Sequence, residues 1–574
     1  MNTIINKNDT YKTIIINVKY LEDTLDMAIS LKRIRKDSID EFNRNVDAAY
    51  EHLKENGFVY VYGNPNVVSY LVGNYLKTQN NLDFRYWIAI NNNKNDGNEH
   101  ALSRNHVAAI MLIRRDSDIF DFDTEACRTK RFACPTCQRN SKDWGGKKHL
   151  LNTKGVAISD VWNDFIKVNS VIGDKDIPNL KLYLSDNDSS VDFKGNCIPQ
   201  PILERLLTLT KSSNDYKIIE MDNVIDLDRE IDDIIDDTIV PNENEINQII
   251  CGDSIEVMEG LLKKYPNGLF DLIFADPPYN LQKNYKNYDD QNSDNEYNDW
   301  CNKWLDLCFK LLKPNGNMLI LNLPKWTIRN ISFLLDNGAK LKDCIVWDAM
   351  STPMGKIMPA HYSLIHLVKR DSKDELIKNE MIYPAINYCL RPSCISNRDS
   401  NNSRKFWLSN IWSDAHRIKH KKDRDDHPCQ LPDKLMNRII QLYSKPGDLV
   451  FDPFCGAGTT AIAAFLNNRN YYTVDISQDY VDIAKRKILN INELGYIKKQ
   501  SEKKVSRKVP KKKMELYTQN KLLELGYKPT DEDFVTIIEN DNDAGFTIED
   551  VLNTYSSVHE LIKKCTFVLR KKDL

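Results

Sequence analysis

The sequence predicts an α/β fold around a mostly parallel sheet, and the prediction is clearest between residues 246 and 490. Short apolar runs, at 248–251, 272–275 and 318–321, alternate there with longer segments of helical periodicity. Turn-forming residues such as those at 314–316 separate the segments. This alternation is typical of a sheet that carries helices on both faces.

One helix is expected between the second and third of these runs. From residue 297 to residue 312, large apolar side chains recur at helical spacing, namely Trp300, Trp304, Leu307, Cys308 and Leu311. Pro314 and Gly316 then end the helix. We interpret this aromatic stripe as core packing.

Length and composition set limits on the protein without naming a function. At 574 residues the chain is long enough for two or three folded units. The formal net charge is only -3, so a nucleic-acid partner has to be argued from local basic patches. The first 16 residues lack an apolar signal core and the 13 cysteines follow no secretory pattern, so we expect an intracellular protein with reduced thiols.

The sharpest signal is the string Asp276-Pro277-Pro278-Tyr279, which follows the second apolar run. An exocyclic amine is a poor nucleophile because its lone pair is delocalised into the base. A carboxylate and a backbone carbonyl that accept its two N–H bonds favour the pyramidal nitrogen of the transition state. Asp276 and the carbonyl of Pro277 can supply these acceptors on a rigid turn, and Tyr279 can stack on an extruded base. An ordinary Pro-Pro turn is the alternative interpretation of the string alone.

A glycine turn supports the first motif. Residues 449–451 run into a turn and then a helical segment, and the turn includes Asp452, Phe454, Gly456, Gly458 and Thr459. Glycine lets the backbone approach a ligand closely, and open α/β sheets bind nucleotides at the carboxyl ends of their strands. Asp475 ends the next apolar run, where an acid can hold ribose hydroxyls. The turn lacks the third glycine of the dinucleotide fingerprint, which argues against a plain NAD-type site.

In this order the two motifs resemble the β class of S-adenosylmethionine-dependent amino-methyltransferases, and the resemblance covers residues 246–490. It implies a Rossmann-like methyltransferase fold, the cofactor S-adenosyl-L-methionine and a site-specific DNA methyltransferase that acts on a base flipped out of double-stranded DNA. An aspartate before Pro-Pro further implies N6 of adenine rather than N4 of cytosine. The expected location is the cytoplasm, with the nucleoid, or the nucleus in a eukaryote.

The resemblance also assigns roles to residues. It implies that the catalytic motif consists of Asp276, Pro277, Pro278 and Tyr279. The cofactor-binding residues that it implies are Asp253, Asp452, Phe454, Gly456, Gly458, Thr459 and Asp475. Asp253 would contact the adenine of the cofactor and Asp475 its ribose, and residues 427–432 would lead into a helix beside its methionine end. No metal is expected in the chemistry.

The N-terminal half looks like a degenerate copy of the half just described. Three collinear matches support a duplication, namely 56–65 with 315–324, 106–117 with 361–372, and 159–164 with 409–414. This half contains no Asp-Pro-Pro-Tyr string, and the residues from Ile218 to Asp222 stand in place of the glycine turn. We therefore expect a tandem pseudo-dimer in which this half binds no cofactor, so that the chain could act as a monomer.

The predicted organisation has four parts. Residues 1–240 form a non-catalytic methyltransferase-like domain that helps to recognise DNA, and residues 241–490 form the catalytic domain. The target-recognition region is expected at about 350–426. A basic linker at 491–513 and a small helical domain at 514–574 follow.

A basic cluster lies inside the expected target-recognition region. It consists of Arg417, Lys419, Lys421, Lys422 and Arg424. Beside a flipped-base pocket, such a cluster is expected to hold DNA phosphates. A solvated surface loop is the alternative.

Three cysteines in the N-terminal half suggest a structural zinc ion. Cys127, Cys134 and Cys137 are close in sequence, and the last two have the two-residue spacer that suits zinc. A second paired spacer is missing, so His149 and Cys197 are the candidates for the fourth ligand. Free thiols in a reducing cytosol are the alternative.

Two other functions remain open at this stage. The same machinery could act on N4 of cytosine or on RNA, and the chain could be a non-enzymatic, sequence-specific DNA-binding protein with relic motifs. The second is disfavoured, because motifs some 180 residues apart are all intact. The pattern fits both a restriction–modification enzyme and a solitary one.

Overall fold

In the computed structural model the chain divides into two compact units, Met1–Ala484 and Lys485–Leu574. The structure describes residues 9–494 except 20–28, 30, 80, 118–119, 141–150, 175–176, 178, 191–196, 223, 226–240, 282–283, 286–287, 290–291, 350–356, 371–375, 383–388, 390, 392, 395, 398–404, 416 and 418–430, and in the tail 535–539, 542–546 and 565–567. Within these ranges, none of the helices combines the length and the apolar character needed to cross a membrane.

The predicted catalytic half is built on an eight-stranded sheet in the order β18-β14-β15-β13-β10-β19-β20-β9. Its strands are β9 (Gln248–Cys251), β10 (Phe270–Ala275), β13 (Leu312–Asn322), β14 (Lys340–Asp348), β15 (His361–Val368), β18 (Ile411–Trp412), β19 (Leu449–Asp452) and β20 (Asn470–Asp475). Only β15 runs against its neighbours, so the sheet is mostly parallel. The three apolar runs form β9, β10 and β13, which confirms the predicted fold class.

The N-terminal half contains a second sheet, in the order β5-β3-β4-β2-β1-β8. Its strands are β1 (Tyr11–Val18), β2 (Leu53–Gly63), β3 (Leu82–Asn91), β4 (His106–Arg114), β5 (Val161–Trp162) and β8 (Tyr216–Met221). Strand for strand, the order and the directions are those of β18-β14-β15-β13-β10-β19. The described part of this half has no counterparts of β20 and β9.

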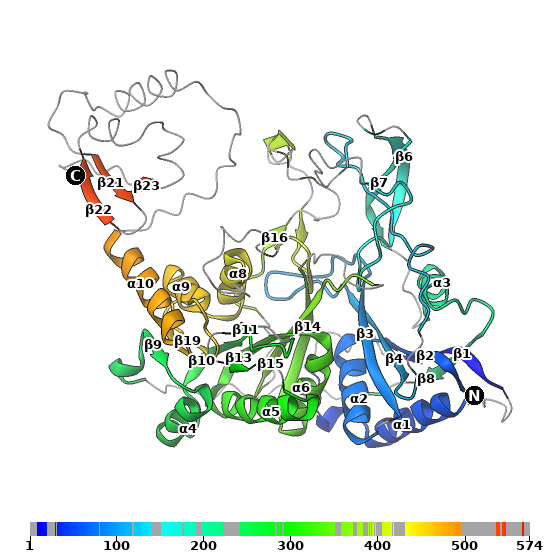
Figure 1. Cartoon of the computed structure of the whole chain (residues 1–574), viewed down its shortest axis with the longest axis horizontal. Helices are drawn as coiled ribbons and strands as arrows, with labels where there is room; N and C mark the ends of the chain where they lie inside the picture. Colours follow the sequence, from blue (N-terminus) through cyan, green and yellow to red (C-terminus); the bar gives the residue numbers. More distant parts are fainter. Residues whose placement is uncertain are drawn as a thin grey trace. The chain divides into compact units, whose positions relative to one another are not determined.

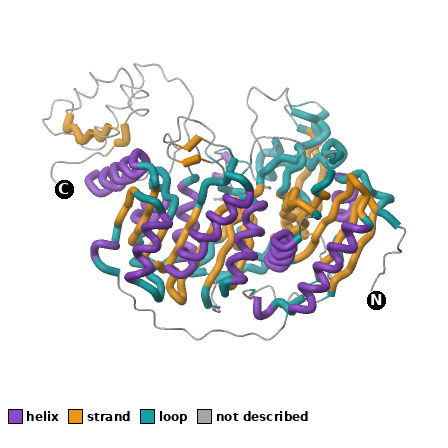
Figure 2. The backbone as a smooth tube through the Cα atoms, turned by 60° about the horizontal axis from the view of Figure 1, so that its bottom comes forward, coloured by secondary structure: helices purple, strands orange, loops and turns teal. Residues whose placement is uncertain are grey.

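A row of helices, along the bottom of Figure 1, packs on one face of both sheets and encloses one continuous apolar core. These helices are α1 (Lys36–Glu51), α2 (Pro65–Thr78), α4 (Ser254–Lys264), α5 (Asp294–Leu311) and α6 (Pro324–Asp336). The remaining helices are α3 (Gln200–Leu209), α8 (Asp433–Tyr443), α9 (Thr459–Leu466) and α10 (Gln478–Leu494), with short turns at Leu31–Arg33 and Glu243–Glu245. Figure 2 shows how helices and strands alternate across the two halves.

Short antiparallel pairs complete the described fold. They are β6 (Ile166–Gly173) with β7 (Lys181–Ser190), β11 (Asn284–Tyr285) with β12 (Tyr288–Asp289), and β16 (Met381–Ile382) with β17 (Phe406–Trp407). The pair β6–β7 forms an arm of the N-terminal half and is kept under that name below.

The two halves are not separate domains, because their interface is part of the shared core. Helix α2 of the N-terminal half packs on α6 of the other half. At Gly73, a Cβ atom would collide with the carbonyl oxygen of Ile328 and lie 3.2 Å from the Cβ of Ser332. The glycine therefore permits the close approach of the two helices.

The interface is also reciprocal in its hydrogen bonds. Asn410 Oδ1 accepts from the backbone N–H groups of Asn105 and His106, both at 2.9 Å. Asp160 Oδ1 accepts from those of Ala360 and His361, at 2.7 and 3.0 Å. Residues that the repeat pairs in sequence thus make the same contact with the opposite half, which supports the interpretation of the N-terminal half as a copy.

The boundary between the compact units falls at residue 484, inside α10, whereas the catalytic domain was predicted to end at residue 490. The described residues of the predicted helical tail form β21 (Val535–Glu539), β22 (Asn542–Phe546) and β23 (Cys565–Phe567), an antiparallel sheet, and the other residues of the tail lie outside the described ones. The β-branched run from Val535 to Ile538 favours a strand. The basic linker lies outside the described residues.

The contact at Gly73 makes a prediction about stability. Gly73→Ala should destabilise the protein by about 1–3 kcal/mol, because the added methyl group overpacks the α2–α6 interface. Gly260→Ala is the matched control: Gly260 also lies within a helix, but its Cβ would meet nothing within 4 Å. The control should gain up to about 1 kcal/mol from helix propensity. Urea unfolding compares the two, and an equal gain in both variants would contradict the tight interface.

A second prediction concerns Asp160, the counterpart of Asn410 in the N-terminal half. Burial raises the pKa of Asp160 to about 7, although the N–H groups of Ala360 and His361 oppose the rise. The folded protein then binds more protons than the unfolded one between about pH 4 and 7, so this carboxyl destabilises the fold increasingly as the pH rises through that window. Asp160→Asn should therefore gain stability over the wild type as the pH rises from 4 to 7, and no further gain should appear above 7.

The converse substitution is the control for this prediction. Asn410→Asp places a buried carboxyl at the equivalent position, close to Asp343, whose Oδ1 accepts from the Asn410 amide at 3.1 Å. Its loss of stability should be greater at pH 8 than at pH 5. The unfolding midpoints of both variants and the wild type are measured at both pH values. If the stability of each variant relative to the wild type does not change with pH, no charge is buried at either position.

Candidate active site

The two sequence motifs face a single cavity at the carboxyl ends of β10, β19, β20 and β9. These four strands are parallel neighbours, so the residues that follow them meet at one edge of the sheet. The cavity measures about 1140 Å³ including its open mouth. Predicted residues that line it are Asp253, Asp276, Pro277, Pro278, Tyr279, Asp452, Phe454, Gly456, Thr459 and Asp475.

The Pro-Pro turn is held from behind by two aromatic side chains. The hydroxyl of Tyr297 donates to the carbonyl of Pro278, and Trp326 Nε1 donates to the carbonyl of Tyr279 at 3.0 Å. Within the described part of the chain, the carbonyl of Pro277 receives no hydrogen bond. The turn therefore leaves one carbonyl available beside the carboxylate of Asp276.

Tyr279 lies over the cavity and touches the carboxylate. Its hydroxyl donates to Asp276 Oδ1, and its ring lies 5.7 Å from that of Tyr362 between centroids. Tyr362 packs in turn on Trp347 at 5.4 Å, and its hydroxyl accepts from Arg417 Nη1 at 3.3 Å. An aromatic line thus leads from the cavity toward the expected target-recognition region.

The glycine turn is organised by Asp475. One oxygen of this carboxylate accepts from the N–H of Gly456 at 2.8 Å, and the other accepts from the N–H of Ser477 at 2.9 Å. Burial raises the pKa of Asp475, while these two N–H groups oppose the rise. Gly456 has φ +50°, a conformation that glycine adopts without strain. Asp475 therefore fixes the turn as well as facing the cavity.

Asp452 supports the same turn from below. It is fully enclosed, and burial raises its pKa to about 7, against hydrogen bonds from the Thr460 hydroxyl and the Phe454 N–H. The nearby charge of Asp475 raises the pKa further. Asp452 therefore holds the turn and the start of α9 in shape as well as lining the cavity.

Comparison with known proteins decides the family. The pattern that defines the DNA methylase family matches residues 270–486. The Type II methyltransferase M.BamHI of Bacillus amyloliquefaciens is 30% identical over 378 residues, which are 64% of this chain and 84% of M.BamHI. The chain belongs to the DNA methylase family.

Other relatives are similar over less than half of this methylase. The DNA adenine methyltransferase YhdJ of Escherichia coli (strain K12) is 30% identical over 280 residues, which are 46% of this chain and 92% of YhdJ. Among solved structures, the M1.HpyAVI–SAM complex is 24% identical and has a TM-score of 0.29, covering 42% of this chain and 98% of that one.

Two predicted cofactor residues of the methylase have structural roles as well. Asp253 Oδ1 caps α4 by accepting from the N–H groups of Ile255 and Glu256, at 2.8 and 3.2 Å. Gly458 is not among the residues that line the cavity. It has φ +84° at the start of α9, and a Cβ there would collide with Ala484 of α10. Gly458 thus permits the packing of α9 on α10, whereas Gly456 lines the cavity.

The cavity also contains residues to which the sequence assigned no role. They are Gly252, Ser254, Phe274, Cys455, Ala457, Thr460, Ile476, Ser477 and Tyr480, together with Trp300, which was assigned to the core. The stripe that includes Trp300 was interpreted as core packing, which is correct for Trp304, Leu307, Cys308 and Leu311, all buried in the core. Trp300 packs against that core and also lines the cavity. Trp300 sits one helical turn nearer the cavity and packs on Phe454 at 5.5 Å. Helical spacing alone does not show which residues of an apolar stripe pack in the core and which line a cavity.

The DNA-contact prediction is only partly described. Of the basic cluster, Arg417 is described, and Lys419, Lys421, Lys422 and Arg424 lie outside the described residues. The 427–432 segment is described from Leu431, which lines the cavity ahead of α8.

The predicted zinc ligands need correction. Cys127 is buried in the apolar core of its own half, where its thiol contacts the carbonyl of Arg205 at 3.7 Å. Cys134 and Cys137 face Cys389 and Cys394 of the other half. Cys197 is exposed and outside this group, and His149 lies outside the described residues. The partners are more than 250 residues away in sequence, so no local spacing could reveal them.

A prediction follows for the glycine turn. Asp475→Asn should weaken binding of S-adenosylmethionine about 10- to 100-fold, since hydrogen bonds to a charged group contribute roughly 1.5–3 kcal/mol. Asp479→Asn, the same change of charge at an exposed position outside the cavity, should leave affinity unchanged. Titration calorimetry measures the affinity of both variants for S-adenosylmethionine. Equal affinities of the two variants would show that Asp475 does not contribute to cofactor binding.

Proposed function

We propose that this methylase transfers a methyl group from S-adenosylmethionine to N6 of an adenine that is flipped out of double-stranded DNA. The observation that carries the proposal is the shared cavity, in which Asp276 and the carbonyl of Pro277 face the same space as the glycine turn. A target amine that donates to Asp276 and Pro277 and a cofactor bound at the glycine turn would therefore share one cavity.

The cavity fits the cofactor by its chemistry. Gly456 brings the backbone close to the ligand, Asp475 and Asp253 offer carboxylate oxygens for hydroxyl and amino groups, and Phe454 offers an apolar wall. When bound there, S-adenosylmethionine supplies an electrophilic methyl group.

The residues of the Pro-Pro turn would activate the target amine. Asp276 and the Pro277 carbonyl would accept its two N–H bonds, which directs the nitrogen lone pair away from the base. Tyr279 would exchange its hydrogen bond with Asp276 for stacking on the base. Transfer would break the S–CH3 bond of the sulfonium as the N–C bond forms, and S-adenosylhomocysteine would leave. The nitrogen would lose one proton, which the Asp276 carboxylate is placed to receive.

Adenine is proposed rather than cytosine because the residue before Pro-Pro is an aspartate, as the resemblance implies. Digestion of methylated DNA to nucleosides, followed by mass spectrometry, separates the two. N6-methyldeoxyadenosine is the expected product. N4-methyldeoxycytidine would overturn the choice of base and leave the methyl-transfer proposal intact.

The N-terminal half is proposed to be a non-catalytic partner that helps to read DNA. The matching order of six strands and the reciprocal hydrogen bonds support a fused, unequal pair in a single chain. The two-fold symmetry that couples a homodimer to a palindrome is then absent, which suits a non-palindromic site and one cofactor per chain. Sequencing of modified bases in DNA from expressing cells tests this, and a strictly palindromic site would contradict it.

The assigned carboxylate makes a direct prediction. Asp276→Asn should reduce methyl transfer by about a hundredfold or more, because one oriented, charged acceptor is lost at the reacting amine. Binding of S-adenosylmethionine should persist, since the glycine turn is untouched. Single-turnover transfer of a labelled methyl group to DNA measures the first effect, and calorimetry measures the second.

The control for this prediction is Asp299→Asn on α5, which changes the same charge at an exposed position outside the cavity. It should transfer methyl groups at the wild-type rate. Turnover close to wild type in Asp276→Asn would refute the catalytic assignment.

A further inference from the structure

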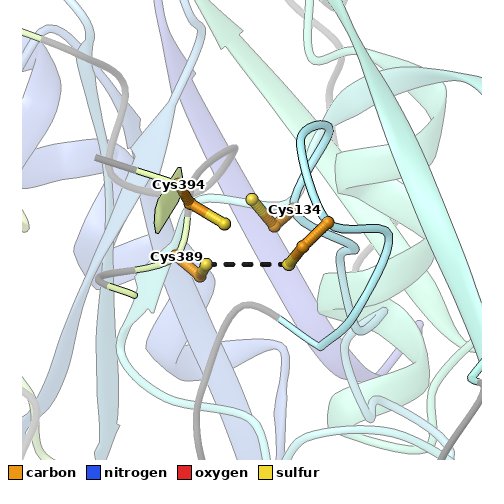
Figure 3. Close-up of side chains that lie close together, drawn as sticks. Cys134, Cys389 and Cys394 are labelled. Carbon is orange, nitrogen blue, oxygen red and sulfur yellow. Dashed lines mark hydrogen bonds between the residues drawn. The ribbon is translucent and has the colours of Figure 1, made fainter. Parts of the chain in front are cut away.

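We propose that Cys134, Cys137, Cys389 and Cys394 bind one zinc ion, which fastens the N-terminal half to the target-recognition region. The four sulfur atoms lie within 4.8 Å of one another, although the two pairs come from different halves of the chain. Figure 3 shows the side chains of Cys134, Cys389 and Cys394 lying close together.

The spacing of the sulfurs is that of a single tetrahedral ion. A Zn–S bond of about 2.3 Å places the thiolates of a tetrahedral site about 3.8 Å apart. The sulfur atoms of Cys137 and Cys389 are 3.8 Å apart. A disulfide would need about 2.05 Å, and all four residues are free cysteines. An iron–sulfur cluster would hold some of the thiolates on different irons and thus further apart.

The surroundings distinguish this group from ordinary buried cysteines. Cys134, Cys389 and Cys394 are almost completely buried, and the compact group they form with Cys137 contains no aliphatic or aromatic side chain. A free buried cysteine usually packs as a small apolar residue. Cys308 does so in this protein, within the core beneath the sheets. Among the described residues, four thiols that group with one another instead of joining an apolar core have the composition of a metal site.

The loops are shaped to present the sulfurs. The N–H of Gln138 donates to the carbonyl of Cys134 at 2.7 Å, and the N–H of Cys134 donates to that of Arg139 at 2.8 Å, which closes a tight turn around the Cys-Pro-Thr-Cys string. The turn places both sulfurs on the same side. On the other half, the N–H of Cys394 donates to the carbonyl of Arg391 at 2.9 Å.

The charges around the group also fit. Zn²⁺ with four thiolates carries two net negative charges, and Arg391 Nη1 lies 3.6 Å from the sulfur of Cys137. The same Nη1 donates to the carbonyl of Asn140 at 3.1 Å, which holds the guanidinium in place. Such outer contacts stabilise thiolates in metal sites.

The ion would join two functional parts of the chain. The turn at 134–137 is attached to the arm β6–β7, since the N–H of Ala133 donates to the carbonyl of Tyr183 at 2.9 Å and Ala133 packs on Leu180 and Leu182. Cys389 and Cys394 belong to the predicted target-recognition region. Four protein ligands leave no open position, so the ion is structural and not catalytic.

The test is metal analysis of the full-length protein. Wild-type protein purified with zinc in the medium should contain one zinc per chain by inductively coupled plasma mass spectrometry. Cys134→Ser and Cys389→Ser should each lower the content to well under half, whereas Cys197→Ser, an exposed cysteine outside the group, should keep one zinc. Wild-type protein without stoichiometric metal, or with iron in place of zinc, would overturn the proposal even if the serine variants fail to fold.

A second measurement tests the link between the halves. Removing zinc from the wild type with a strong chelator should lower the melting midpoint by more than about 5 °C. Amide exchange should then rise together at residues 131–140 and 389–397, because one ion orders both segments. A rise in only one segment would contradict the bridge. Neither readout depends on the proposed methyl transfer, so failure of that proposal leaves this one testable.

Discussion

The packing of α2 on α6 is the constraint on which the rest of the structure depends. The two helices approach at Gly73 and Ile328, and around them the two sheets share one apolar core. Above this contact, His106 Nδ1 bonds the carbonyl of Cys344 at 2.9 Å, and His361 Nδ1 bonds the carbonyl of Trp87 at 3.0 Å. Each half therefore supplies hydrogen-bond partners for buried polar groups of the other, and either half alone would leave those groups without them.

The same interface positions the edge of the sheet that leads to the target-recognition region. Arg104 Nη1 and Asp343 Oδ2 form a buried ion pair across it at 2.6 Å, and Asn410 bonds the same aspartate. A buried pair of this kind adds little net stability, but removal of either partner leaves a charge uncompensated. The pair ties β14 to the N-terminal half, and Trp347 of β14 packs on Tyr362 of β15, which lies beside Tyr279.

Local patterns predicted the parts of this protein that depend on neighbours in sequence. The apolar runs formed β9, β10 and β13, and the residues after β10, β19 and β20 met at one cavity because carboxyl ends of parallel strands share an edge. Trp300, Ser477 and Tyr480 escaped prediction, since they reach the cavity through the packing of helices that no spacing encodes. The partners of Cys134 escaped for the same reason, because only the reciprocal interface brings residue 389 to residue 137.

Comparing the two halves of the chain identifies equivalent residues that neither half would reveal alone. The matched strings 159–164 and 409–414 place Arg205 and Arg438 in the same relation to Trp162 and Trp412, each with a bidentate bond to an aspartate. What the N-terminal half retains is the interface, and what its described part lacks are the strands that carry Asp253 and Asp475 in the other half. Because this retained surface completes the catalytic core, truncation would expose α6 and confound any loss of DNA recognition with a loss of folding. The two roles separate only through substitutions away from this contact, such as those on the arm and at the four cysteines, which leave the α2–α6 packing intact.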